Sequence, residues 1–107
     1  PHEAMAVGRP SIVPPFFALS EFCDDSVSYP VDYSLVPSTN FYEGRGLWAN
    51  PSIGHCAEIM RSLYADRVSV PLKGEAGAER AAQYTFDRMV EGYDSVLRYY
   101  FKNEDYF

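Results

Sequence analysis

The chain has 107 residues, a formal net charge of −6, 47% hydrophobic residues and 16% aromatic residues. This length allows one domain at most, and this content of apolar and aromatic residues argues against an intrinsically disordered chain. The negative charge argues against direct binding of nucleic acid, because neutralising phosphates needs clustered Lys and Arg, and against binding to an anionic membrane surface. The sequence also lacks a run of about 18 apolar residues, so no transmembrane segment is expected.

The chain begins at Pro1 and not at Met. We expect that either a leader has been removed or the numbered chain is a fragment of a longer protein. Targeting information is then missing from the sequence, and the compartment stays open.

Residues 1–50 are expected to form an extended arm. They hold six of the eight prolines, and proline fixes its own φ and pushes the preceding residue toward extended geometry. The Pro-Pro-Phe-Phe sequence at 14–17 predicts a short polyproline-like segment that leads into an aromatic anchor. Residues 28–36 alternate loosely between apolar and polar and predict an edge strand, where proline is tolerated.

Turn-forming residues at 38–40 and 43–46 flank Phe41-Tyr42, and Trp48 follows. The Gly-Arg-Gly sequence at 44–46 is too short to predict a phosphate-binding loop, since it lacks a third glycine, a preceding strand and a Walker lysine. It predicts a flexible turn that lets Tyr42 and Trp48 dock on opposite sides of it.

A first amphipathic helix is predicted over residues 51–66. Asn50 suits the N-cap and Pro51 suits the first helical position. Apolar residues then recur at steps of mostly three or four: Ile53, Cys56, Ala57, Met60, Leu63 and Tyr64. Pro71 favours an extended connection over residues 68–74.

The clearest helical pattern covers residues 75–102. Its apolar positions follow helix periodicity: Ala82, Phe86, Met89, Val90, Tyr93, Val96, Leu97, Tyr100 and Phe101. One continuous helix of this length would be about 40 Å long, more than a small domain needs, so it is expected to lie on another surface. Residues 103–107 end on Tyr106 and Phe107, either as a docking peptide or as a frayed terminus.

These patterns together predict a mainly α fold. Its body would be a two-helix hairpin, about 51–66 and 75–102, preceded by a long extended arm rich in proline and aromatic residues. The predicted organisation divides the arm, 1–50, from the helical body with its short C-terminal tail, 51–107.

The polar residues show no pattern typical of catalysis or metal binding. His55 and Cys56 are neighbours and point about 100° apart on a helix, so they cannot form a dyad, and no GxSxG motif is present. His55 and Glu58 share a helix face but are too few ligands for zinc. We therefore expect no enzymatic activity, no cofactor and no metal.

The two cysteines, Cys23 and Cys56, are 33 positions apart, which excludes a CxxC pair. A disulfide between them would tie the arm to the first helix. Two reduced thiols are favoured instead, because Cys56 falls on the apolar face of its predicted helix and is expected in the core.

We expect a non-enzymatic, small acidic accessory subunit that binds and stabilises a larger protein complex. The arm cannot easily satisfy its own backbone polar groups alone, but it can do so along another protein. Aromatic side chains are expected to fill pockets of that partner: Phe16, Phe17, Tyr42, Trp48, Tyr106 and Phe107. An extrinsic subunit of an organellar or photosynthetic membrane complex, in a chloroplast or mitochondrion, is the setting that this type of subunit suggests.

Two other classes of function stay open. An acidic inhibitor of phage or pathogen type would occupy a basic nucleic-acid-binding cleft, and its binding would be strongly salt-sensitive, unlike an association through aromatic residues. A small enzyme would lose a measurable activity, but not its fold, when His55 or Cys56 is replaced.

Overall fold

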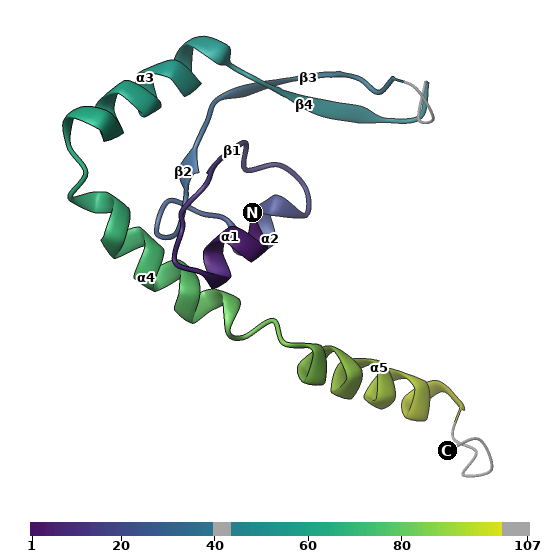
Figure 1. Cartoon of the computed structure of the whole chain (residues 1–107). Coiled ribbons are helices and arrows are strands. Elements are labelled where there is room, and N and C mark those ends of the chain that lie inside the picture. Colours follow the sequence, from purple (N-terminus) through teal and green to yellow (C-terminus); the bar gives the residue numbers. More distant parts are fainter. Residues whose placement is uncertain (40–43, 102–107) are drawn as a thin grey trace.

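The computed structural model describes residues 1–39 and 44–101 (Figure 1). The described helices are α1 (His2–Ala6), α2 (Leu19–Phe22), α3 (Ile53–Ala65), α4 (Ser69–Ala81) and α5 (Phe86–Phe101). The described strands are β1 (Ile12–Val13), β2 (Tyr29–Pro30), β3 (Tyr33–Pro37) and β4 (Leu47–Pro51). About half of the chain is helical, so the mainly α prediction is confirmed at this level.

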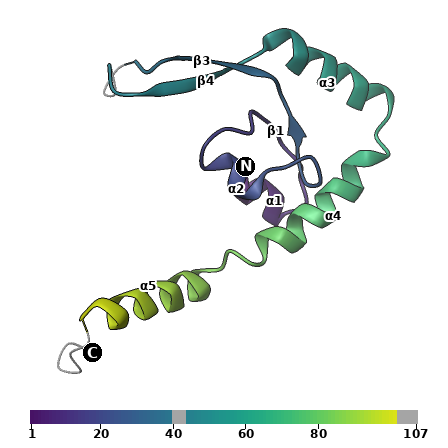
Figure 2. The same cartoon turned by 180° about the vertical axis from the view of Figure 1, so that it is seen from behind.

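The molecule is elongated. Helices α3 and α4 follow one another along an arc, the β3–β4 hairpin projects from one end of the arc, and α5 projects from the other (Figures 1 and 2). Its principal extents are 60 × 39 × 17 Å and its radius of gyration is 18.3 Å. A compact domain of about 100 residues has a radius of gyration of about 13 Å. Much of the apolar surface therefore stays outside any core.

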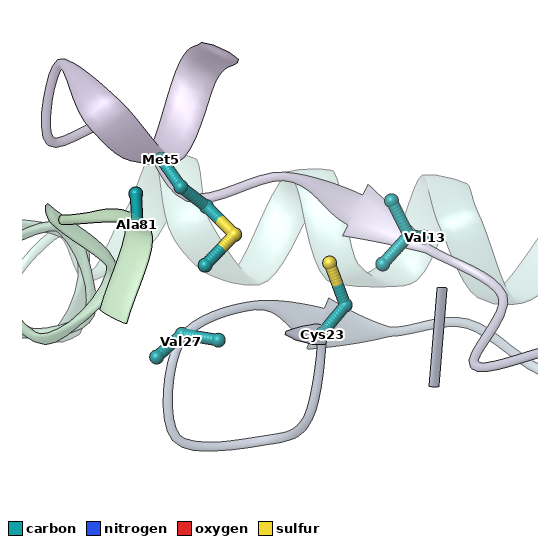
Figure 3. Close-up of a cluster of buried hydrophobic side chains, with 5 residues drawn as sticks. All are labelled: Met5, Val13, Cys23, Val27 and Ala81. Atoms are coloured by element: carbon teal, nitrogen blue, oxygen red, sulfur yellow. The ribbon is translucent and has the colours of Figure 1, made fainter. Parts of the chain in front are cut away.

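One small core holds the N-terminal part of the chain against α4. Its buried side chains come from α1, β1, the segment after α2 and the end of α4: Met5, Val13, Cys23, Val27 and Ala81 (Figure 3). Leu19, Phe22 and Ala76 pack around this cluster. The extended arm predicted over residues 1–50 is thus not confirmed, because its first part supplies most of the core.

Two short strand pairs satisfy backbone groups that were expected to need a partner. β1 and β2 pair in parallel, and the N–H of Tyr29 donates to the carbonyl of Ser11 (2.9 Å) while the N–H of Val31 donates to Val13 (3.0 Å). β3 and β4 pair antiparallel from Tyr33 opposite Pro51 to Pro37 opposite Leu47. The prolines lie at strand ends, where a missing N–H is tolerated.

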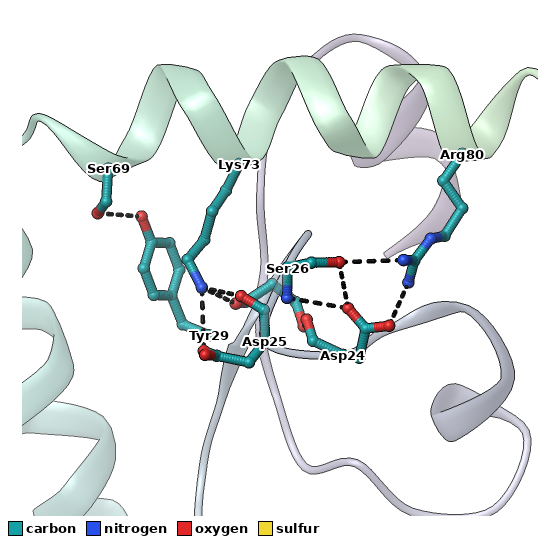
Figure 4. Close-up of polar contacts among 8 residues, drawn as sticks. Asp24, Asp25, Ser26, Tyr29, Ser69, Lys73 and Arg80 are labelled. Carbon is teal, nitrogen blue, oxygen red and sulfur yellow. Dashed lines mark hydrogen bonds and ion pairs between the residues drawn. The ribbon is translucent and has the colours of Figure 1, made fainter.

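Arg80 on α4 fixes the turn that follows α2 (Figure 4). Its guanidinium donates to the Asp24 carboxylate (2.8 Å), the Ser26 hydroxyl (3.0 Å) and the carbonyl of Phe22 (3.3 Å). Hydrogen bonds from the Ser26 hydroxyl and from Arg80 lower the pKa of Asp24 to about 2. The Asp24 side chain is more than half exposed, so this ion pair contributes little beyond orientation.

Lys73, nearly two turns earlier on α4, holds the other end of the same turn. Its ammonium group contacts the carboxylate and the carbonyl of Asp25 and donates to the carbonyl of Ser28 (3.0 Å). It also lies 4.8 Å from the ring centroid of Tyr29, whose hydroxyl lies 2.8 Å from the Ser69 hydroxyl. The polar side chains of Ser69, Lys73 and Arg80 on α4 therefore all contact the N-terminal part of the chain.

The prediction of a helix over residues 51–66 is close to the observed α3, but its N-cap is Ser52. The Ser52 hydroxyl accepts from the N–H of His55 (3.2 Å). Asn50 and Pro51, which were expected to begin the helix, belong to β4 instead. Pairing with Tyr33 and Ser34 keeps them extended.

The continuous helix over 75–102 and the two-helix hairpin are wrong. α4 begins at Ser69 with Pro71 in its first turn, where no backbone donor is needed. α5 begins anew at Phe86, because the Thr85 hydroxyl accepts from the N–H of Arg88 (3.3 Å) and acts as an N-cap. Among the described residues, α4 packs mainly on α1, and α3 does not fold back along it.

Candidate partner-binding surface

Two of the predicted partner-binding residues line one apolar hollow. Phe16, in the segment after β1, and Trp48, on β4, lie around a space of about 300 Å³ together with Pro14, Leu19 and Ala49. Trp48 is 43% exposed. The hollow lies between the segment from Pro14 to Leu19 and strand β4 of the hairpin. Residues from distant parts of the sequence therefore share one surface.

Phe17 lies beside this hollow and combines an exposed aromatic side chain with a left-handed backbone conformation. Its ring centroid is 6.2 Å from that of Phe16, and the residue is 82% exposed. Its φ is +51°, in the left-handed region, which costs a residue other than glycine about 1–2 kcal/mol. The carbonyl of Phe17 accepts from the N–H (3.0 Å) and the hydroxyl (2.6 Å) of Ser20, which holds this conformation.

Three other predicted residues, Tyr42, Tyr106 and Phe107, lie outside the described residues. Their predicted part in partner binding therefore stays a prediction.

The apolar face of α3 forms a second exposed surface that sequence reasoning missed. Ile53, Cys56, Ala57 and Met60 line a hollow of about 360 Å³ beside Pro51. Ile53 is 86% exposed. The periodic pattern of these residues was interpreted as the inner face of a hairpin, and the absence of the hairpin leaves that face to solvent.

A third, more polar hollow of about 380 Å³ lies on the other side of α3. It is lined by Tyr29, His55, Glu58, Ile59, Ser62, Leu63, Asp66 and Ser69. The His55 ring nitrogen Nδ1 accepts from the N–H of Asp32 (3.0 Å), which ties α3 to the segment between β2 and β3. His55 and Cys56 line different hollows, as expected for neighbours on a helix.

Cys23 and Cys56 are both free thiols. Cys23, and not Cys56, is the buried one, so the expectation that Cys56 lies in the core is wrong. Burial raises the pKa of the Cys23 thiol. A buried thiol with a raised pKa behaves as a small apolar core residue and is poorly reactive.

Residues 1–39 and 44–101 contain no group of three or more His, Cys, Asp or Glu side chains placed to hold a metal ion. Within the same residues, no helix has the length and apolar character needed to cross a membrane.

Comparisons with protein-family models, with curated proteins and with solved structures give no match to this chain.

Proposed function

We propose that this protein is a non-enzymatic accessory subunit that docks on a larger protein assembly through the surface around Phe17. The observation that carries the proposal is Phe17 itself. An aromatic side chain here is exposed to water and also occupies a backbone conformation that favours glycine. Both features disfavour phenylalanine in the isolated chain, and strained residues of this kind gather at binding sites.

The surroundings of Phe17 support the same function. Phe16 and Trp48 line the adjacent hollow, and Leu35 and Leu47 are exposed on the hairpin. Aromatic side chains presented in this way are typical of the residues that dominate the affinity of protein interfaces. The partner surface expected from this chemistry is an apolar groove with pockets for aromatic rings. An extrinsic subunit of an organellar or photosynthetic membrane complex is the concrete form that we propose.

The Phe17→Gly substitution separates binding from folding. We expect it to leave the free energy of unfolding unchanged or to raise it by up to about 1 kcal/mol, because glycine adopts this φ without strain. We expect the affinity for the partner to fall at least about thirtyfold, as at an interface hot spot. Denaturant unfolding and titration calorimetry measure the two quantities. Val7→Ala, which removes another exposed apolar side chain on a different element, is the matched control.

The partner is identified first by a photo-reactive p-benzoylphenylalanine in place of Trp48, used in an extract of the native source. The same group in place of Glu3, on α1, is the control position. One protein cross-linked from position 48 and not from position 3 is the expected result. Equal affinity of the wild type and Phe17→Gly for that protein would overturn the proposal.

Salt dependence distinguishes this proposal from an acidic inhibitor. Association through apolar and aromatic contacts changes little between about 50 and 300 mM salt, whereas an acidic protein in a basic cleft loses affinity steeply. A steep loss would favour the inhibitor.

A further inference from the structure

Helix α5 carries an apolar stripe that the rest of the described chain does not cover. Its members are 41–74% exposed: Phe86, Met89, Val90, Tyr93, Val96, Leu97 and Tyr100. Every residue of α5 is exposed or half-buried, and the helix projects away from the core in both views (Figures 1 and 2). At about 100° per residue these positions fall within one stripe along the helix.

The stripe is symmetric about Tyr93. Counting three, four and seven residues in either direction from Tyr93 reaches an apolar residue each time: Val90 and Val96, Met89 and Leu97, Phe86 and Tyr100. Residues related in this way have similar size and character. In an antiparallel pair of such helices with the two-fold axis at Tyr93, each member of the stripe would face the residue that lies equally far on the other side of Tyr93 in the second helix, so Phe86 would face Tyr100.

The charged residues of α5 leave this stripe free. Asp87, Arg88, Glu91, Asp94 and Arg98 all lie outside it, and Arg98 donates to the Asp94 carboxylate on the same helix (2.7 Å). Three acidic and two basic residues give the helix a net charge of only −1. Two copies of α5 therefore meet without like charges opposed in the apolar seam.

We propose that α5 binds a second copy of itself, antiparallel, with the two-fold axis at Tyr93. A two-fold interface requires a self-complementary surface, and the symmetric stripe supplies one. An aromatic side chain can bury about 150–250 Å², and the three aromatic residues of the stripe are 66–74% exposed. The stripe thus offers on the order of 500 Å² per copy, and two copies bury on the order of 1,000 Å², where specific interfaces begin.

The hollow at the beginning of α5 supports the antiparallel direction. A space of about 590 Å³ lies among Gln83, Tyr84, Thr85, Phe86, Arg88 and Met89. The symmetry places Tyr100 of the second copy opposite Phe86, where its ring enters this space. The interface is separate from the surface around Phe17, so Phe17→Gly leaves it intact.

Sedimentation equilibrium of the 107-residue chain tests the proposal, with Tyr93→Glu and Ser95→Glu as a matched pair. We expect twice the chain mass of 12.1 kDa for the wild type and for Ser95→Glu, whose new charge faces solvent. Tyr93→Glu places two carboxylates at the axis and is expected to raise the dissociation constant at least about thirtyfold. We take about 100 µM as the weakest dissociation constant of a specific dimer. A wild type that is still monomeric at this concentration would overturn the proposal, and so would a dimeric Tyr93→Glu.

Disulfide trapping in a Cys56→Ser background tests the direction of the pair. Phe86→Cys mixed with Tyr100→Cys is expected to give the mixed disulfide on mild oxidation. Phe86→Cys alone is expected to give little, because in the antiparallel pair its symmetry mates lie about 20 Å apart along the helix, beyond disulfide reach. Predominant self-pairing of Phe86→Cys would instead show a parallel arrangement and would contradict the proposal.

Discussion

Gly74→Ala is expected to lower the free energy of unfolding by about 3 kcal/mol, at the upper end of the cost of overpacking. α1 and α4 form the main helix–helix contact of the core, and Gly74 is buried where they meet. A Cβ atom at Gly74 would lie 3.1 Å from the carbonyl carbon of Gly8 and inside contact distance of its oxygen. Both obstacles are backbone atoms of Gly8, so the segment that follows α1 would have to move away from α4.

Gly77→Ala, three residues further along the same helix, is the control for Gly74→Ala. Its Cβ would lie 3.6 Å from Cγ of Met5, an ordinary van der Waals contact. We expect a change of less than about 1 kcal/mol, since the helix propensity of alanine favours the variant. Urea unfolding followed by circular dichroism measures both variants. Equal stability of the two would show that α1 does not pack on α4 at Gly74.

Met5→Ala is expected to lower the free energy of unfolding by about 3 kcal/mol, through lost apolar burial and the cavity left behind. Met5 is 1% exposed and contacts the core from α1. Ile53→Ala removes a side chain of similar size from α3, where it is 86% exposed. We expect this control to cost less than about 0.5 kcal/mol, as at most surface positions. Similar costs for both would mean that α3 is buried in the isolated chain.

The periodic patterns predicted the existence of helices better than their packing. The pattern from Ile53 to Tyr64 placed α3 to within a few residues, and the pattern from Phe86 to Phe101 covers α5. The break between α4 and α5 was missed, although Thr85 is a side chain suited to an N-cap. Pro71 was interpreted as a sign of extended chain, but a proline is equally suited to the first turn of a helix.

The location of the core was not predicted, for a physical reason. Met5, Val13, Cys23 and Val27 are spread over segments without a helical or strand period, so nothing local marks them as buried. They come together because packing them against α4 removes apolar surface from water, while Lys73 and Arg80 orient the turn after α2 on that helix. Such distant pairings leave no periodic signal in sequence. The apolar face of α3 was expected to be buried in a hairpin and that of α5 to lie on another surface, and both are exposed in the described chain. An amphipathic pattern predicts an apolar face but not what covers it.

The prediction of partner-binding residues rested in part on the extended arm, which is not confirmed. Phe16, Phe17 and Trp48 were also chosen because they lie in segments without helical or strand periodicity. Aromatic residues in such segments were expected to contact another protein. The structure brings Phe16 and Trp48 to one hollow and leaves Phe17 exposed beside it. The backbone strain at Phe17 could not be predicted, because the identity of a residue does not determine its φ angle.

The central claim is that the apolar surface outside the small core serves to bind another protein. Hydrogen exchange tests it most directly, measured on the isolated protein and on its complex with the cross-linked partner. We expect the slowest amides of the isolated chain in α4 and around β1 and β2, with much faster exchange in α3 and β4, which lack a buried contact surface. Binding of the partner is expected to slow the amides of β4 and of residues 16–19. Protection of α3 and β4 equal to that of α4 in the isolated chain, unchanged in the complex, would contradict the account.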